Sequence, residues 1–326
     1  TFEAFRATIV AGLSCGMSGI PFWGWDLGGF SGDIPTAELY VRSAAMAAFC
    51  PVMQYHAESK GQFNMDRTPW NIAERTGRPE VLSLYKRFAD IRMNLLPYVW
   101  EQAGKSAATG YPLMRAMLLA YPDEEECADL TTQYLFGDSL LVAPVAEEGA
   151  LETEVYFPQG RWLSLFDSEI VVGPRTDTVE AGWADIPVYL RENAVVPLNL
   201  GAARELADDV GNAVDRYANL TLMIYATDSL VYRFEDESGC AIGLTVFKNG
   251  ASLEARVEVQ GGEAPVTLLF RGLERQAVNV TEEGQSWRHA DAAGDLSAGS
   301  WLAGTGEALV CAGQGDYVFT IELGQQ

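Results

Sequence analysis

The fold is decided by one stretch near the start of the chain, Gly19-Ile20-Pro21-Phe22-Trp23-Gly24-Trp25-Asp26-Leu27-Gly28-Gly29-Phe30. Its first half is apolar and aromatic, which predicts a short buried strand that ends at Asp26. A glycine-rich loop follows. In parallel α/β barrels the ligand site lies at the carboxyl ends of the strands, so Asp26 is a candidate site residue.

A second apolar run begins about 30 residues after the first, which is the usual period of a strand–helix–strand unit with parallel strands. This run, Cys50-Pro51-Val52-Met53-Gln54-Tyr55, is predicted to be a short strand, and it ends at His56. A polar loop with Pro69-Trp70 is expected after it. Helices are predicted over residues 2–14 with Thr1 as N-cap, from Pro35 and Thr36 to Phe49, and over residues 79–103. The first hundred residues therefore indicate an α/β fold.

After Gly110 the pattern changes to short strand-like runs separated by turn residues. The runs cover residues 139–144, 154–157, 187–190, 220–225, 230–233, 243–248, 255–259, 266–270 and 317–322. Many short strands at this spacing indicate antiparallel β-sandwiches. Boundaries near 108 and 205 divide the chain into three predicted domains, 1–108, 109–205 and 206–326.

The composition excludes several classes of protein. The chain has 326 residues, is 48% apolar, and carries a net charge of −23 with a pI near 4.4. So acidic a surface repels phosphate backbones, which argues against nucleic acid as a partner, whereas a neutral sugar is not repelled. No apolar run is long enough to span a membrane. The five cysteines are odd in number and widely spaced, which predicts reduced thiols in a cytoplasmic protein and neither a disulfide framework nor a zinc site.

Several aromatic side chains accompany the two predicted strand ends: Phe22, Trp23, Trp25, Phe30 and Tyr55. Aromatic faces suit the C–H face of a sugar ring, and carboxylate and imidazole groups can hydrogen-bond its hydroxyls. Each residue also has a structural interpretation: Asp26 could cap the amides of Gly28 and Gly29, and His56 could be a core histidine. Trp23 and Trp25, two residues apart, could be core packing on one face of a strand.

Other features carry less chemistry. Glu58 and Arg67 are predicted to form a solvated ion pair in a polar loop. The chain has no metal-binding motif, nucleophile elbow, phosphate-binding loop or dinucleotide fingerprint, so no metal or cofactor is expected.

The stretch around Asp26 resembles the motif that glycoside hydrolase family 31 carries on its seventh barrel strand. Further stretches resemble the family in the same order, at residues 38–42, 54–56, 69–70, 95–98, 110–115, 136–145, 155–162 and 186–191. The resemblance covers about residues 1–200. The last third of the chain fits the distal β-sandwich of the family only by its position and strand pattern.

This resemblance implies the last strands and helices of a TIM barrel, followed by a proximal and a distal β-sandwich. It also implies a retaining exo-α-glycosidase acting on terminal α-linked glucose, or xylose, without a cofactor. Carried over by motif, Asp26 lines the sugar pocket, Phe30 packs against the sugar and His56 bonds its hydroxyls. Trp23 and Trp25 shape the wall of this pocket.

The two catalytic carboxyl groups of the family have no counterpart in this sequence. Retaining chemistry needs a nucleophile and an acid/base about 5 Å apart. Asn64-Met65-Asp66 lies in the wrong loop to replace them. We therefore expect no catalytic residue in this chain, and expect both in an upstream segment of the same enzyme. The alternative is a non-catalytic carbohydrate-binding or structural fragment, which would have no use for two barrel strands carrying Asp26 and His56.

Overall fold

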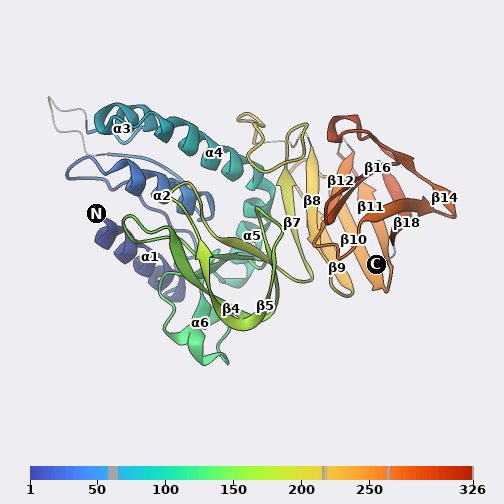
Figure 1. Ribbon diagram of the computed structural model, residues 1–326, viewed down its shortest axis with the longest axis horizontal. Helices are drawn as coiled ribbons and strands as arrows, with labels where there is room; N and C mark the ends of the chain where they lie inside the picture. The colour runs from blue at the N-terminus through green and yellow to red at the C-terminus, as the bar shows by residue number, and fades with distance from the viewer. Residues whose placement is uncertain (58–64, 215–216, 218, 263–264, 325–326) are drawn as a thin grey trace. The chain divides into compact units, whose positions relative to one another are not determined.

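The computed structural model describes residues 1–57, 65–214, 217, 219–262 and 265–324 (Figure 1). These residues form two compact units. The first comprises residues 1–92, 102–160 and 172–189, and the second comprises residues 93–101, 161–171 and 190–326. The three-domain division at 108 and 205 stays a prediction.

The helices described in the first 120 residues, outside 58–64, are labelled in Figure 1: α1 (Phe2–Met17), α2 (Ala37–Ala48), α3 (Pro69–Thr76), α4 (Glu80–Asn94), α5 (Leu96–Thr109) and α6 (Met117–Ala120). The predicted cap of α1 is confirmed, because the Thr1 hydroxyl accepts from the Ala4 amide at 3.2 Å. Thr36 caps α2 in the same way, through the Leu39 amide at 3.2 Å. Both starts follow from a side-chain oxygen that satisfies an otherwise unpaired amide.

Two helix predictions were wrong in detail. The helix expected over residues 79–103 is two helices, α4 and α5, separated at Leu95. Pro97 lacks the amide that a continuous helix would need there. The loop expected around Pro69-Trp70 is the start of α3, with Thr68 as N-cap, Pro69 in the first turn and Gly77 as a left-handed C-cap at φ 66°. Proline at the start and glycine at the end are standard helix signals.

The two predicted barrel strands, 20–25 and 50–55, are also corrected. The structure has no named strand in either segment and joins them by one parallel bridge, between Asp26 and Gln54. Pro21 and Pro51 cannot donate to a ladder. The carbonyls of Cys50 and Pro51 accept instead from the Arg92 guanidinium. Three apolar side chains of these segments are exposed: Ile20, Phe22 and Val52.

Most of a six-stranded sheet belongs to the first unit, in the order β1-β2-β3-β6-β4-β5. The strands are β1 (Met114–Ala116), β2 (Tyr134–Phe136), β3 (Leu140–Val142), β4 (Glu152–Ser164), β5 (Ile170–Glu180) and β6 (Val188–Arg191). Phe157 on β4 packs edge-on against Tyr189 on β6, with ring centroids 4.7 Å apart. Paired aromatic side chains of this kind stabilise a core beyond their buried area.

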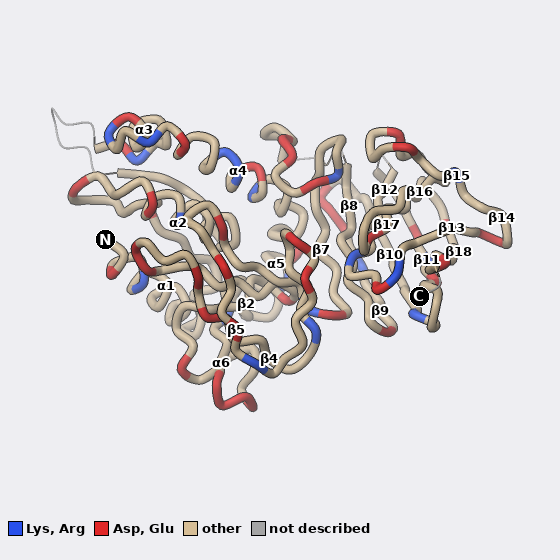
Figure 2. Tube along the Cα trace, viewed as in Figure 1, with Lys and Arg blue, Asp and Glu red and all other residues tan. Residues whose placement is uncertain are grey.

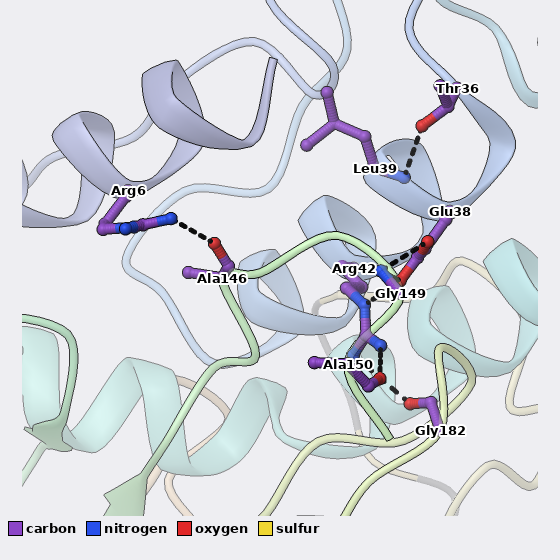
Figure 3. A network of polar contacts seen from close by, with 9 residues as sticks. All are labelled: Arg6, Thr36, Glu38, Leu39, Arg42, Ala146, Gly149, Ala150 and Gly182. Atoms are coloured by element: carbon purple, nitrogen blue, oxygen red, sulfur yellow. Dashed lines mark hydrogen bonds and ion pairs between the residues drawn. The ribbon is translucent and has the colours of Figure 1, made fainter. Parts of the chain in front are cut away.

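A buried arginine ties the helices of the first unit to the loops of its sheet (Figure 3). Arg42 on α2 is 2% exposed and pairs with Glu38 at 2.8 Å. Its guanidinium also donates to the carbonyls of Ala150 and Gly182. The Glu38 carboxylate accepts from the Gly149 amide at 3.0 Å. The family-like run 38–42 therefore has a structural role.

The second unit contains a sandwich of two six-stranded sheets, ordered β14-β13-β18-β11-β10-β9 and β15-β16-β17-β12-β8-β7. Its strands are β7 (Ala194–Asn199), β8 (Leu220–Tyr225), β9 (Leu230–Glu235), β10 (Ala241–Asn249), β11 (Ser252–Gln260), β12 (Val266–Arg271), β13 (Ala277–Glu282), β14 (Gln285–Ser286), β15 (Arg288–His289), β16 (Ser300–Gly304), β17 (Glu307–Ala312) and β18 (Gly315–Leu323). The inner faces share one apolar core, in which Phe270 meets Phe319.

All nine strand runs predicted after residue 110 fall on observed strands. In the two sheets of the second unit the pairing is antiparallel with two exceptions, since β8 pairs with β12 and β15 with β16 in parallel. The chain leaves β8, passes through β9, β10 and β11 in the other sheet, and returns beside β8 as β12. A connection of this length allows a parallel neighbour.

Acidic side chains outnumber basic ones by 45 to 22 and are spread over helices and strands of both units (Figure 2). All five cysteines are free, and four of them are buried. Among the described residues, the helices are too short or too polar to cross a membrane.

Candidate functional site

The two segments that carry the candidate residues lie side by side at Asp26 and Gln54. The Leu27 amide donates to the Gln54 carbonyl at 3.1 Å. The Gln54 side-chain amide donates to Asp26 Oδ1 at 2.9 Å. This contact fixes one oxygen of the partly exposed carboxylate, and a carboxylate can accept further hydrogen bonds at its remaining lone pairs.

The capping interpretation of Asp26 is wrong. The Gly29 amide donates to the backbone carbonyl of Asp26 at 2.8 Å, so the turn closes without the carboxylate. Gly28 and Gly29 take φ values of 70° and 90° in this turn. Residues with a β-carbon rarely adopt such values, which explains the glycine pair. The carboxylate bonds Gln54 instead.

Phe30 and His56 meet next to this bridge, with ring centroids 5.3 Å apart and ring planes at 40°. Phe30 is 45% exposed, and His56 is exposed as well. The core interpretation of His56 is therefore wrong. The bridge thus gathers an acceptor, an imidazole and an aromatic face from two segments about thirty residues apart.

Trp23 and Trp25 lie against α1. Their rings stack at 5.5 Å, as expected for residues two apart on one face, and Trp25 approaches Phe5 on α1 at 6.2 Å. A β-carbon at Gly12 would come within 2.7 Å of the Trp23 ring, so α1 needs glycine there. The packing interpretation describes these contacts. Their role as the wall of a sugar pocket stays a prediction.

Arg67 was missed as a functional residue. Its side chain is fully buried, so the interpretation of Arg67 as half of a solvated pair is wrong. The partner named in that interpretation, Glu58, lies outside the described residues. Burial lowers the pKa of the guanidinium, while the nearby carboxylates of Asp33 and Asp66 raise it.

The Arg67 guanidinium donates to four backbone carbonyls, three of them in or directly after the glycine-rich loop. Its Nε donates to Gly29 at 3.1 Å, and its Nη2 donates to Gly32 and Asp33, each at 3.1 Å. Nη1 donates to Met65 at 2.6 Å. Arginine spreads five N–H donors over a planar fork, whereas lysine has three on a single nitrogen, so acceptors this far apart suit an arginine. Arg67 therefore positions the loop that carries Phe30. A local sequence pattern does not reveal this role, because the carbonyls that need a donor come from the tertiary fold.

The chemistry available at this edge is binding. The Asp66 side chain accepts from the Thr68 amide at the start of α3, at 3.1 Å. In the part of the chain that the structure describes, no three His, Cys, Asp or Glu side chains group as metal ligands. Burial raises the pKa of the Cys50 and Cys127 thiols to about 12, which makes them poor nucleophiles. A carboxylate, an imidazole and a phenyl face together suit a neutral hydroxylated ring.

Two family descriptions match the chain. "Glycosyl hydrolases family 31 TIM-barrel domain" matches residues 1–102, and "Glycosyl hydrolase family 31 C-terminal domain" matches residues 110–196. The chain is similar to an isomaltosyltransferase of Sporosarcina globispora, at 42% identity over 74% of this chain and 22% of that protein. It is 44% identical to a 1,3-alpha-isomaltosidase of Kribbella flavida over 59% of this chain and 27% of the relative.

Solved structures of carbohydrate-active enzymes are similar to nearly the whole chain, which again covers only part of their length. The cycloalternan-forming enzyme of Listeria monocytogenes, in complex with a pentasaccharide substrate, matches with a TM-score of 0.91 and 33% identity. The match covers 99% of this chain and 31% of that one. The chain thus spans between a fifth and a third of the length of these proteins.

Proposed function

Because this chain belongs to glycosyl hydrolase family 31, we propose that it forms the C-terminal part of a retaining α-glycosidase and holds the terminal sugar with Asp26, Phe30 and His56. The observation that carries this proposal is the Asp26–Gln54 bridge, since it puts the three side chains at one exposed edge. Asp26 accepts from sugar hydroxyls, His56 bonds a further hydroxyl, and Phe30 packs against the C–H face.

Bond cleavage requires two more carboxyl groups. In a retaining mechanism one attacks the anomeric carbon and the other protonates the leaving oxygen, with about 5 Å between them. The 326 residues contain neither family motif. The nucleophile and the acid/base accordingly belong to a segment outside this sequence, and this chain contributes binding and orientation.

The sugar is a glucosyl unit in this proposal. Relatives named alpha-xylosidase also match, at 33% identity in Saccharolobus solfataricus. The two more similar relatives carry names for isomaltosyl chemistry, which supports a gluco-oligosaccharide substrate that contains an isomaltosyl group. Xylose lacks the C6 hydroxymethyl group whose oxygen links the two glucose rings of an isomaltosyl group, so the pocket cannot be shaped equally well for both. We also propose a cytoplasmic location, which the five free thiols support.

The test compares residues 1–326 alone with the longer protein that contains them. Aryl α-glucoside, aryl α-xyloside and an α-1,3-linked isomaltosyl oligosaccharide are the substrates. We expect no turnover by the 326-residue chain and turnover by the longer protein, fastest with the isomaltosyl substrate. Turnover by the short chain would place the catalytic carboxyl groups within it. A longer protein that binds these sugars without cleaving them would support the non-catalytic alternative.

Asp26→Asn separates binding from folding. An asparagine can keep the contact with Gln54 by presenting its amide oxygen, so the melting temperature should be almost unchanged. The anionic acceptor is lost, which should lower kcat/KM of the longer protein roughly 10- to 150-fold. This factor corresponds to a loss of about 1.5–3 kcal/mol of binding energy in the transition state. A lower melting temperature with normal kcat/KM would show that Asp26 is only structural.

A further inference from the structure

A hollow of about 180 Å³ lies within the second unit, formed by residues other than Asp26, Phe30 and His56. Three separate stretches of the chain contribute to it. Its lining is Leu96, Trp100, Val214, Tyr217, Asp236 and Glu237. The volume is below the roughly 300–1,000 Å³ of pockets for drug-sized ligands, so the hollow suits one ring.

The apolar side of the hollow is held in place by a buried polar anchor. Asn94 is fully buried, and its side-chain amide donates to the carbonyls of Asn199 at 2.9 Å and Asp208 at 3.0 Å. Its oxygen accepts from the Ala207 amide at 2.8 Å. This anchor fixes the start of α5. Leu96 and Trp100, four residues apart on α5, lie on one face of the helix, and the indole remains 46% exposed.

The polar side comes from the turn between β9 and β10. One oxygen of Asp236 accepts from the Ser238 amide, the Ser238 hydroxyl and the Cys240 amide, at 2.7 to 2.9 Å. These bonds fix the carboxylate. Within the described residues, neither its second oxygen nor the Glu237 carboxylate accepts a hydrogen bond. Burial and these two carboxylates raise the pKa of Tyr217 to about 12, so its phenol stays protonated.

Among its described lining residues the only charged groups are the carboxylates of Asp236 and Glu237, which repel an anionic ligand. An exposed indole offers a face to C–H groups, and two carboxylates can accept hydroxyl protons. We propose that this hollow binds a single neutral glucosyl unit of an α-glucan chain. The proposed function supplies the identity of the sugar, whereas the binding chemistry follows from the lining itself.

Binding is measured on residues 1–326 by calorimetry and ligand-observed NMR, with isomaltose as the probe. Trp100→Ala should raise the dissociation constant at this hollow by about tenfold, since it removes the aromatic face. Trp100→Phe should restore most of the affinity, and Glu237→Gln should weaken binding by a smaller factor. Phe247→Ala is the matched control, because Phe247 is an aromatic residue of the same unit with 51% exposure and is absent from the lining.

The Asp26→Asn background isolates this hollow from the proposed sugar site. Isomaltose binding that persists in Asp26→Asn and is lost in Asp26→Asn with Trp100→Ala supports the inference, even if the longer protein proves to lack glycosidase activity. Equal affinity in the Trp100→Ala and unsubstituted chains overturns it, provided that circular dichroism shows both folded. Displacement of isomaltose by tetramethylammonium at similar concentration would identify a cation site and overturn it as well.

Discussion

Arg67→Ala should lower the free energy of unfolding of this chain by about 3–5 kcal/mol, because four backbone carbonyls lose their donor at once. A buried polar group left without a partner costs about 1–3 kcal/mol, and water entering the space of the side chain reduces the sum. Urea unfolding followed by circular dichroism measures the loss. The same substitution in the longer protein should raise KM, since the loop that carries Phe30 is no longer held.

Two substitutions make the Arg67 prediction specific. Arg67→Lys keeps the charge but replaces the planar guanidinium with a single ammonium group. Its free energy of unfolding should therefore lie between those of Arg67→Ala and the unsubstituted chain. Arg75→Ala removes an exposed arginine from the neighbouring helix α3 and should change the free energy of unfolding by less than about 0.5 kcal/mol. Equal losses of stability in Arg67→Ala and Arg75→Ala would contradict the conclusion that Arg67 holds the glycine-rich loop.

Arg42→Leu should destabilise the chain by about 2–4 kcal/mol, somewhat below the 3–5 kcal/mol typical of breaking a buried ion pair. The substitution leaves Glu38 without its cation and removes the donor to the carbonyls of Ala150 and Gly182. Glu38 retains 23% exposure and the Gly149 amide, which limits the cost. Urea unfolding again provides the measurement.

The double substitution Arg42→Leu with Glu38→Gln tests the cause. If an unpaired carboxylate is responsible for part of the loss, the double variant should be more stable than Arg42→Leu alone. Arg6→Ala is the control, because exposed Arg6 donates to the Ala146 carbonyl of the same loop at 3.3 Å and should cost less than 1 kcal/mol, about the value of one hydrogen bond. A loss of stability in Arg6→Ala as large as that in Arg42→Leu would contradict the special role of the buried Arg42 contacts.

Local pattern was sufficient for six of the sandwich strands that the structure describes. Alternating burial along β11, for example, follows the alternation of apolar and polar residues from 252 to 260. Such a strand has one face to the core, so its sequence records its environment residue by residue. The strand predictions for segments 20–25 and 50–55 were wrong because these segments lack such an alternation. Their apolar composition is that of a strand covered on both faces, and composition alone does not supply the neighbours that would make one.

The family motif around Asp26 located the candidate site, and the structure added its contacts. Gln54 was noted only within the second apolar run and the family-like stretch 54–56, without a role of its own, yet it is the residue that binds the Asp26 carboxylate. Arg67 was assigned to solvent because a charged residue in a polar loop is usually solvated. Its burial depends on carbonyls that come together only after the loop has formed.

The sequence by itself determined helices α1 and α2, nine of the later strands, the family and the residue types at the proposed sugar site, because periodicity, caps and motifs are properties of neighbouring residues. Only the tertiary structure decided which side chains meet. The Asp26–Gln54 contact joins residues 28 positions apart. Arg42 donates to the carbonyls of Ala150 and Gly182, which lie 108 and 140 positions further along the chain. Contacts at such distances depend on how the whole chain packs, and no local pattern encodes them.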